Sequence, residues 1–565
     1  LERGTKSMKK SLAYLLSGMM TLGLVGCGGS SIGTTTPTAG ATAGTTTTGD
    51  GATSMVVAIG AQFDTLDPQL STTLYNSYVI NSIYSGLTKI NADSSTSYDL
   101  AESSETSEDG LTWTFHLKKD VTFNDGTPIT SANYVYSYLR ALSYGVDNAF
   151  RVNDMQQMIK GAQDYSNRAY EAGDAFDCTT EDHSDVGIEA PDDYTLVLTL
   201  NYPVPYFLTT VAGGGVFSPL PLDTPQHTSD WSVTPGYATC GEYELAEFSL
   251  NDKAVLKKSD TYYGKDAVKM DEITYQVMPD VDAQYAAFQT GDVDVALSVS
   301  VSTALSYKGT DNLWVLTYPS CYSLVLNCGE TGPDFLKDVN VRKALYEAID
   351  KEALVDVIGG EEIYPVLNGY VPFGLFGETK DFRTERDEEG YESSYNPEEA
   401  KALLEAAGYS ESNPLKFTYK YSKNSIHEDV ATMLQSMWKA LGCVEVDFDA
   451  VESYDQLDQG DFQIGRYGLQ AEASPINFLK NWTSANLVYN SVNDPKYDKM
   501  IDDAKYITDP TEFAKALHEA EDYLVQEQFL EFPLFQFSSP ALVSSSLSGY
   551  ELHSTMPYFS ACVKD

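Results

Sequence analysis

The stretch DGLTWTFHLKKDVTFNDGTP, residues 109–128, carries the clearest structural pattern in the chain. Trp113, Phe115 and Leu117 alternate with polar residues, which predicts a strand with one buried face. Residues 124–128, Asn-Asp-Gly-Thr-Pro, are typical of a tight turn, because Asp and Gly supply the required dihedral angles. We therefore expect this stretch to define the fold and not to contact a ligand.

Further strands and helices are predicted on both sides of this stretch. Alternating apolar residues at 196–200 and 273–277 predict two more strands. Asn396, Pro397 and Glu399 have the order of a helix N-terminus, and residues 341–349 place apolar side chains on one helical face. Asp-Pro pairs at 494–495 and 509–510 predict two more helix starts. This irregular alternation favours α/β domains with mixed sheets.

Length and charge limit the classes of function. The chain has 565 residues, more than one hydrophobic core accommodates. Its formal net charge is -46, so its surface repels phosphate backbones, and we expect no nucleic-acid partner.

The N-terminal segment has the pattern of an exported lipoprotein. Basic residues at 9–10 precede an apolar stretch at 12–25, too short to span a membrane and typical of a signal peptide. The stretch ends at Cys27 and resembles the bacterial lipobox, which implies cleavage before Cys27 and lipidation of its thiol. A signal peptide with a chance cysteine is the alternative. Residues 28–53, rich in Thr, Gly, Ser and Ala, predict a flexible tether.

No catalytic or metal-binding motif stands out, so we expect no enzyme activity, cofactor or metal. The six histidines are scattered, and no Cys or His spacing fits a zinc site. Asp292 and Asp294 resemble part of a calcium loop, but its Gly and Glu are missing, and surface carboxylates are the simpler interpretation. Six cysteines remain after Cys27, and the sequence leaves their pairing open.

Several segments, in order along the chain, resemble the family 5 solute-binding proteins, the peptide- and nickel-binding components of ABC importers. These segments are residues 65–68 (TLDP), 83–87 (IYSGL), 100–103 (LAES), 109–118, 121–128, 204–207 (VPYF), 240–245 (CGEYEL) and 338–350 (DVNVRKALYEAID).

The resemblance implies a periplasmic-binding-protein-like fold of type II, with three α/β lobes, mixed sheets and an interlobe ligand cleft. The expected division is a signal peptide at 1–27, a tether at 28–53, lobe I at 54–98, 216–300 and 541–565, lobe II at 99–215, and lobe III at 301–540.

A ligand site follows from the same resemblance. Residues 466–472 correspond to the oligopeptide-binding run Arg-x-Gly-Trp-x-Ala-Asp, so Glu472 would hold the ammonium group of a peptide. A buried ammonium needs a buried opposite charge. Glu replaces the family's Asp, and Leu469 replaces its Trp, so Glu472 could instead be an ordinary loop carboxylate.

Five more residues complete the implied site. Backbone groups of Gly468 and Gln470 would pair with the peptide as an added strand, and a strand near Leu74 would flank it. His427 would lie near the peptide's carboxyl end, and Tyr454 would line a side-chain pocket, although both could equally be ordinary surface or core residues.

Arg466 completes the set of candidate residues. It would either brace Glu472 or meet a ligand carboxylate, and a purely structural ion pair is an equal alternative.

The sequence thus predicts a monomeric, lipid-anchored protein on the extracytoplasmic face of a bacterial membrane. It would capture oligopeptides and deliver them to the permease and ATPase subunits of an ABC transporter. A dipeptide, a signalling peptide, a nickel chelate or a glycan is the alternative ligand, and a hydrolase is the alternative class.

Overall fold

The computed structural model describes residues 53–143, 149–388, 395–452, 461–470, 474–484, 494–553 and 556–565. Cys27, Tyr454 and Glu472, with the signal peptide and nearly all of the tether, lie outside the described residues.

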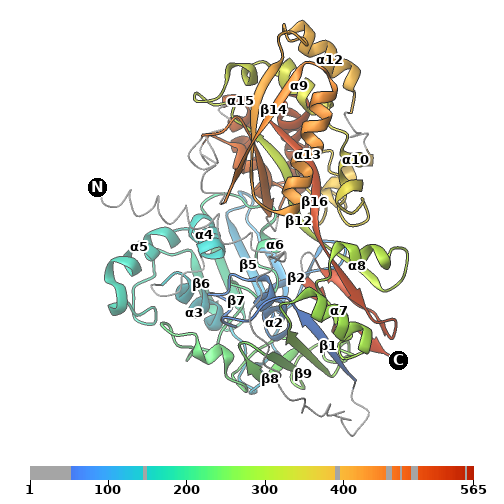
Figure 1. The fold of residues 1–565 in the computed structure, drawn as a ribbon. Coiled ribbons are helices and arrows are strands. Elements are labelled where there is room, and N and C mark those ends of the chain that lie inside the picture. The colour runs from blue at the N-terminus through green and yellow to red at the C-terminus, as the bar shows by residue number, and fades with distance from the viewer. Residues whose placement is uncertain are drawn as a thin grey trace.

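A ten-stranded mixed sheet runs through the whole molecule (Figure 1). Its strands in spatial order are β14 (Val444–Val451), β13 (Leu415–Ser422), β15 (Ile464–Gln470), β12 (Leu313–Leu326), β16 (Glu531–Val543), β11 (Val295–Ala296), β1 (Ser54–Ile59), β10 (Glu272–Val277), β9 (Lys253–Lys258) and β8 (Tyr243–Ser249).

Smaller sheets surround the lower part of the molecule. A four-stranded antiparallel sheet has the order β4 (Ala101–Thr106), β5 (Thr112–Leu117), β7 (Thr195–Thr199) and β6 (Ile188–Asp192). Two-stranded sheets pair β2 (Thr88–Ile90) with β3 (Thr96–Tyr98), β17 (Leu547–Ser548) with β20 (Val563–Lys564), and β18 (Glu551–His553) with β19 (Met556–Tyr558).

The helices divide into two groups. The lower part carries α2 (Leu74–Ile83), α3 (Ser131–Ala141), α4 (Ala149–Met158), α5 (Ala162–Ala172), α6 (Phe207–Thr210), α7 (Val281–Thr290) and α8 (Val301–Ser306). The upper part carries α9 (Val339–Glu347), α10 (Lys351–Ile358), α11 (Phe382–Glu388), α12 (Pro397–Ala406), α13 (Ser425–Ala440), α14 (Ile476–Leu479), α15 (Pro495–Ala504) and α16 (Pro510–Asp522).

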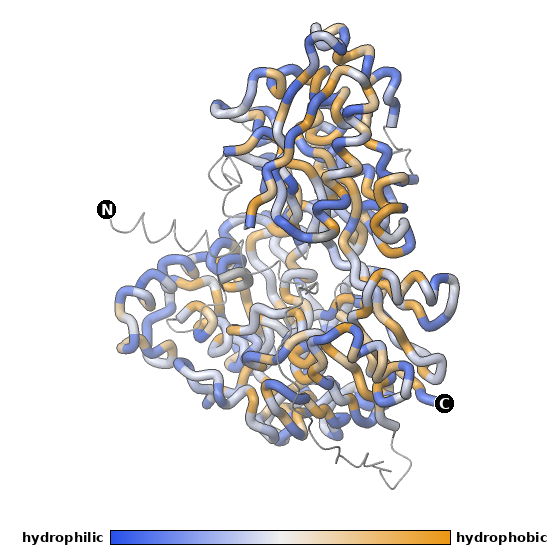
Figure 2. Tube along the Cα trace, in the orientation of Figure 1, coloured by the Kyte–Doolittle hydropathy of each residue, from blue (hydrophilic) through white to orange (hydrophobic). Residues whose placement is uncertain are grey.

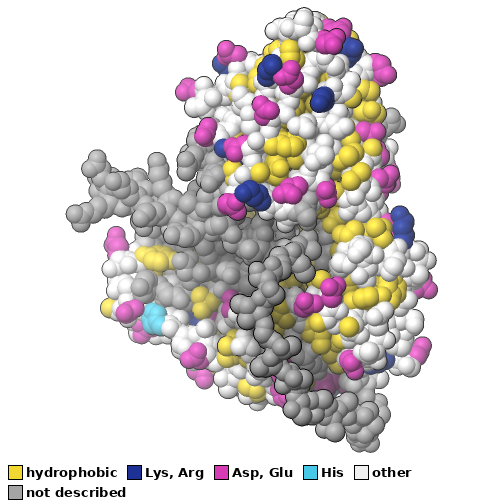
Figure 3. Space-filling view, in the orientation of Figure 1, with side chains coloured by type: hydrophobic (Ala, Val, Ile, Leu, Met, Phe, Trp, Pro, Cys, Tyr) yellow, Lys and Arg dark blue, Asp and Glu magenta, His cyan; other side chains and the backbone are white. Residues whose placement is uncertain are grey.

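Two hydrophobic cores define two bodies within the described residues. We call the part built around residues 55–295 and 541–562 the lower body, and the part built mainly around residues 321–535 the upper body. Figure 2 shows hydrophobic segments inside both, and Figure 3 shows acidic side chains over the visible face of both. No helix in the described ranges is long and apolar enough to cross a lipid bilayer.

The locally encoded elements are confirmed. β5, β7 and β10 form where alternation predicted strands, although Trp113 is only half-buried and packs on Phe207 with ring centroids 5.5 Å apart. Asn396 caps α12 by accepting a hydrogen bond from the Glu399 amide, and α15 and α16 begin at the predicted Asp-Pro pairs. Gly126, in the predicted turn, has φ of 86°, which a glycine adopts without strain.

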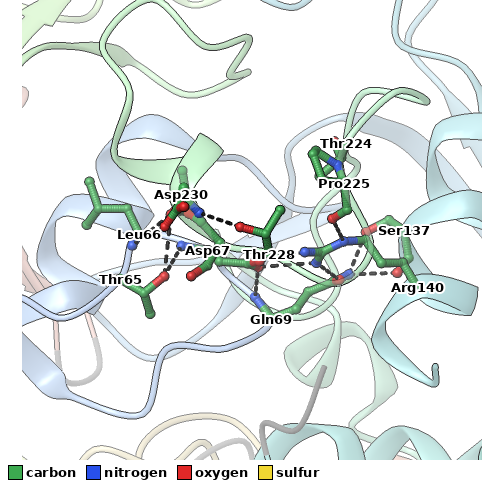
Figure 4. Close-up of polar contacts among 12 residues, drawn as sticks. Thr65, Leu66, Asp67, Gln69, Ser137, Arg140, Thr224, Pro225, Thr228 and Asp230 are labelled. Atoms are coloured by element: carbon green, nitrogen blue, oxygen red, sulfur yellow. Dashed lines mark hydrogen bonds and ion pairs between the residues drawn. The ribbon is translucent and has the colours of Figure 1, made fainter. Parts of the chain in front are cut away.

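The TLDP segment at 65–68, which follows β1, is held to α3 by buried polar contacts (Figure 4). Asp67 and Arg140 of α3 are both fully buried and form an ion pair of 2.6 Å. Arg140 also donates to the Gln69 side chain at 2.5 Å and to the Pro225 carbonyl at 2.9 Å. Each buried charge is therefore paired and hydrogen-bonded, as burial of a charge requires.

Asp294 corrects the expectation of a surface carboxylate. It is 8% exposed, accepts from the Val56 amide at 2.9 Å and pairs with Lys564 at 2.9 Å. Lys564 also donates to the Ser54 carbonyl, so Asp294 joins β1 to the C-terminal segment. The sequence pattern missed this role because both partners are distant in the chain. The six cysteines of the two bodies are unpaired.

Candidate functional site at the crossing between the two bodies

β12 and β16 carry the chain between the two bodies, and both are irregular at the same level. Their antiparallel register shifts between Thr317 and Cys321, next to Pro319. Tyr318 belongs to the lower core, whereas Cys321 belongs to the upper core. The crossing therefore takes place within a few residues, where a bulge interrupts the regular ladder.

Gln536 of β16 supplies hydrogen bonds at this irregularity. Its side chain is fully buried and donates to the carbonyls of Tyr318 at 2.6 Å and Phe373 at 3.0 Å. Its side-chain oxygen accepts from the Phe373 amide at 2.9 Å. Gln536 thus satisfies backbone groups that the shifted ladder leaves without a strand partner.

β15 presents a partly open edge beside the crossing. On one side, β12 pairs with the whole strand, from Ile464 opposite Leu326 to Gln470 opposite Ser320. On the other side, β13 pairs only with Ile464 and Gly465. Among the described residues, the backbone of 466–470 therefore has no strand partner on that side. Such an edge accepts an extended chain as an additional strand.

A buried cation lies on β15 among aromatic rings. Arg466 is 1% exposed, and its guanidinium carbon lies 4.9 Å from the ring centre of Tyr322 and 5.6 Å from that of Phe537. Aromatic faces attract a cation, most strongly where water is excluded. Burial, partly opposed by the charge of Arg466, raises the pKa of Tyr322 to about 12, so this phenol stays neutral.

His427, in the first turn of α13, belongs to the same cluster. Its ring centre lies 5.5 Å from that of Tyr322. Burial and the charge of Arg466 lower the pKa of His427 to about 2, so the imidazole is neutral at physiological pH. The cluster therefore carries one cationic side chain, Arg466, next to a neutral imidazole.

Tyrosines form the lower side of the crossing. Tyr75 of α2 lies against Gly60 at the C-terminal end of β1, so close that a Cβ on Gly60 would be 2.7 Å from the Tyr75 hydroxyl. Tyr78 follows with its ring centre 5.9 Å from that of Tyr75, and it hydrogen-bonds Tyr318 on β12. The C-terminal ends of parallel strands are where open α/β sheets commonly bind ligands.

The structure brings together five of the predicted site residues. Arg466, Gly468, Leu469 and Gln470 lie on β15, and His427 packs beside Arg466 through Tyr322. The strand expected near Leu74 is wrong, because Leu74 is the first residue of α2. Thr73 caps this helix, and its side chain accepts a hydrogen bond from the Asn76 amide. Glu472 and Tyr454 lie outside the described residues.

Sequence reasoning missed the residues of the two crossing strands. Tyr318, Tyr322, Gln536 and Phe537 were not singled out, although residues 318–326 and 532–537 are rich in apolar and aromatic side chains. Such runs are typical of strands buried on both faces, and two of them far apart in the chain were the available signal.

A cavity of about 460 Å³ on the upper body is separate from this site. It is lined by Thr331, Pro333, Thr418, Lys420, Asp449, Asp461, Phe462 and Gln463. Gln463 precedes β15 at the end opposite Gln470, and seven residues of strand span about 23 Å. No group of three or more His, Cys, Asp or Glu side chains in the described part of the chain is placed to hold a metal ion.

Comparisons with known proteins agree with this architecture. The profile of the bacterial extracellular solute-binding proteins, family 5, matches residues 96–490. The chain is 27% identical to the periplasmic oligopeptide-binding protein OppA of Haemophilus influenzae over 510 residues, covering 88% of this chain and 90% of the relative. It is 26% identical to the glutathione-binding protein GsiB of Escherichia coli, covering 84% and 87%.

Solved structures share the fold. The unliganded open form of the murein-tripeptide-binding protein MppA superimposes with a TM-score of 0.78 at 23% identity, covering 91% of this chain and 98% of that one. Haemophilus influenzae OppA in complex with the peptide RPPGFSPFR gives a TM-score of 0.62 at 25% identity, covering 90% and 99%. The fold is therefore that of the periplasmic binding proteins.

Proposed function

The chain belongs to the bacterial extracellular solute-binding proteins of family 5, and on this premise we propose that it captures oligopeptides at the crossing between its two bodies. As a member of that family it is a binding component of ABC import and not an enzyme. We further propose that it hands intact peptides to permease and ATPase subunits as a monomer.

The observation that carries this proposal is the open edge of β15 beside a buried cation. The backbone of 466–470 offers main-chain hydrogen bonds, which suit any peptide sequence because every residue carries the same groups. Arg466 lies on this strand and would attract a ligand carboxylate. Neutral His427 adds a polar group without a competing charge.

The lobe assignment forms part of the proposal. Lobe I comprises 54–98, 216–300 and 541–565, lobe II comprises 99–215, and lobe III comprises 301–540. Most buried residues of lobes I and II belong to the lower core, and most of those of lobe III belong to the upper core. Ala296 and Val299 of lobe I belong to the upper core, and Leu316 and Tyr318 of lobe III belong to the lower one. Closure would rotate lobe III about the bulged crossing of β12 and β16, since a hinge needs a short irregular segment.

Mass spectrometry of material that co-purifies with the protein tests the ligand class. We expect intact peptides of several sequences. A recovered dipeptide, glycan or metal chelate would replace the oligopeptide assignment, and a compound consumed during incubation would contradict a binding protein altogether.

Calorimetry with tri-alanine tests the residues. Because Glu472 is proposed to hold the peptide ammonium, Glu472→Gln and N-acetylated tri-alanine should each weaken binding, with exposed Glu411→Gln as the matched control. Arg466→Met should weaken tri-alanine more than its carboxyl-amidated form. Equal affinity for free and acetylated peptide would remove Glu472 from the ammonium role.

We also propose that Cys27 carries a lipid anchor. Its place directly after an apolar stretch and before the Thr- and Gly-rich tether supports this. Metabolic labelling with an alkynyl fatty acid should label the protein that retains Cys27 and should not label the Cys27→Ala variant. Label on the alanine variant would refute the anchor.

A further inference from the structure

The two bodies touch at a second place, which involves neither β12 nor β16. Gly110, in the turn between β4 and β5, lies so close to Thr508 that a Cβ on the glycine would be 2.9 Å from Thr508 Cγ2. The ring of Tyr206, which immediately precedes α6, stacks on Phe513 of α16, with centroids 5.9 Å apart and planes inclined by 23°. We call Gly110, Tyr206, Thr508 and Phe513 the side contact.

Tyr206 is shared by the two bodies. Within the described residues, it is the only partly buried hydrophobic side chain that packs against both hydrophobic cores. Its partner Phe513 is 6% exposed and belongs to the upper core, so the stack connects one core to the other. A stacked aromatic pair stabilises a contact beyond the area that it buries.

Opposite charges accompany the stack. Lys480 of the upper body is half-buried, and its desolvation lowers the pKa of its ammonium, while the charge of Asp154 on α4 acts in the opposite direction. Burial, and after it the charge of the same carboxylate, raises the pKa of Tyr202, shortly after β7, to about 12. The charge of Asp154 therefore acts on Lys480 of the upper body and on Tyr202 and Tyr206 of the lower one.

The side contact uses two segments of the sequence that the ligand site leaves unexplained, residues 109–118 and 204–207. The turn is held by Asp109, which accepts from the Ser107 hydroxyl at 2.5 Å and from the Leu111 amide at 3.1 Å. Gly110 has φ of 70°, so a side chain there would be strained as well as pressed against Thr508. A rigid turn without a side chain at Gly110 allows the upper body to approach the lower body closely at this point.

We propose that the side contact is a resting seat for the upper body, which stabilises the ligand-free arrangement against closure. Closure about β12 and β16 would turn the upper body relative to the lower one, and we expect this turn to separate the two stacked rings, which lie on opposite bodies. A contact made only before closure lowers the apparent affinity for ligand, because the side contact must break before the closed form is reached and its free energy opposes binding.

Small-angle X-ray scattering of ligand-free protein tests the seat without any assumption about the ligand. Protein stripped of bound material by unfolding and refolding would be compared with Tyr206→Ala and with Tyr206→Phe, the control that keeps the ring. We expect the alanine variant to depart from the scattering profile calculated from this structure and the phenylalanine variant to follow it.

A second variant covers the case in which Tyr206→Ala does not fold. Thr508 is exposed, so Thr508→Trp leaves both cores intact and inserts a wedge against Gly110. It should shift the scattering profile in the same way. Profiles of the folded variants that match the unmodified protein would overturn the proposal.

Affinity for tri-alanine provides a second readout, which rests on the proposed function. Loss of the stack should strengthen binding roughly two- to tenfold, the range that an aromatic pair supports. Weaker binding by folded Tyr206→Ala would contradict a seat that opposes closure. If no variant binds tri-alanine, the proposed ligand class fails, while scattering still decides the seat.

Discussion

Replacing Arg140 by Met should selectively destabilise the lower body. The substitution leaves the fully buried Asp67 carboxylate without its counter-ion and removes donors to Gln69 and to the Pro225 carbonyl. Removing one partner of a buried pair typically costs about 3–5 kcal/mol, because the remaining charge stays desolvated. Methionine fills much of the same volume, so the loss reports on charge and hydrogen bonding more than on a cavity.

Hydrogen exchange followed by mass spectrometry resolves where stability is lost. A loss of about 3–5 kcal/mol accelerates exchange through global opening roughly 100- to 4,000-fold, at 1.4 kcal/mol per factor of ten. We expect this acceleration in peptides from α3 and residues 220–233, and little change in α13 of the upper body. Lys499→Met, which breaks the exposed pair with Asp503, is the control and should change neither.

The double variant Asp67→Leu with Arg140→Met completes the test. Removing both charges should restore part of the stability, because no uncompensated charge remains buried. The reasoning fails if Arg140→Met alone costs less than about 1 kcal/mol, the range of an exposed pair. It also fails if the double variant is less stable than Arg140→Met.

Three shorter predictions address other features. The folded pKa of His427 is about 2 and the unfolded value about 6.5, so its stability contribution is complete above pH 6.5 and is lost as pH falls towards 2. Urea titrations would give the free energy of unfolding from pH 7 to pH 5. This free energy should fall less in His427→Gln than in the original protein, with a difference of at most about 1.4 kcal/mol per pH unit. An equal dependence on pH in both proteins would argue against a buried neutral imidazole. Gly86→Ala should destabilise by about 1–3 kcal/mol in urea unfolding, because its Cβ would lie 2.6 Å from the Gly213 carbonyl oxygen, whereas Gly215→Ala, with no atom within 4 Å, should be neutral. Gln536→Leu should accelerate exchange of the Phe373 amide, which the Gln536 side-chain oxygen accepts from at 2.9 Å, and unchanged exchange there would exclude the bracing role.

Local signals in the sequence were sufficient for much of the secondary structure. Caps such as Asn396, Asp494 and Asp509 act within three residues of the helix that they start, so the relevant physics lies in the local sequence. Leu74 shows the opposite case. A family analogy predicted a strand, but Thr73 caps a helix there, and the cap residue was the local signal that would have corrected the prediction.

The ligand site was only partly accessible from sequence. The resemblance named Arg466 and His427 separately and did not predict that they share a neighbour. The two residues lie on different elements and meet only through Tyr322. The crossing depends on β12 pairing with β16, more than 200 residues later, a contact that no local pattern encodes. The burial of Asp294 was missed for the same reason, because Lys564 completes its environment.

The link between Lys564 and Ser54 joins residues 510 positions apart, so the first strand is secured by almost the last side chain. β11 and β12 likewise each pair with β16, so this part of the sheet is complete only when β16 is present. Neither body can therefore be completed before residues 531–564 have been synthesised. Because these contacts join segments so far apart in the chain, we expect slow folding, with both cores open to solvent until β16 pairs.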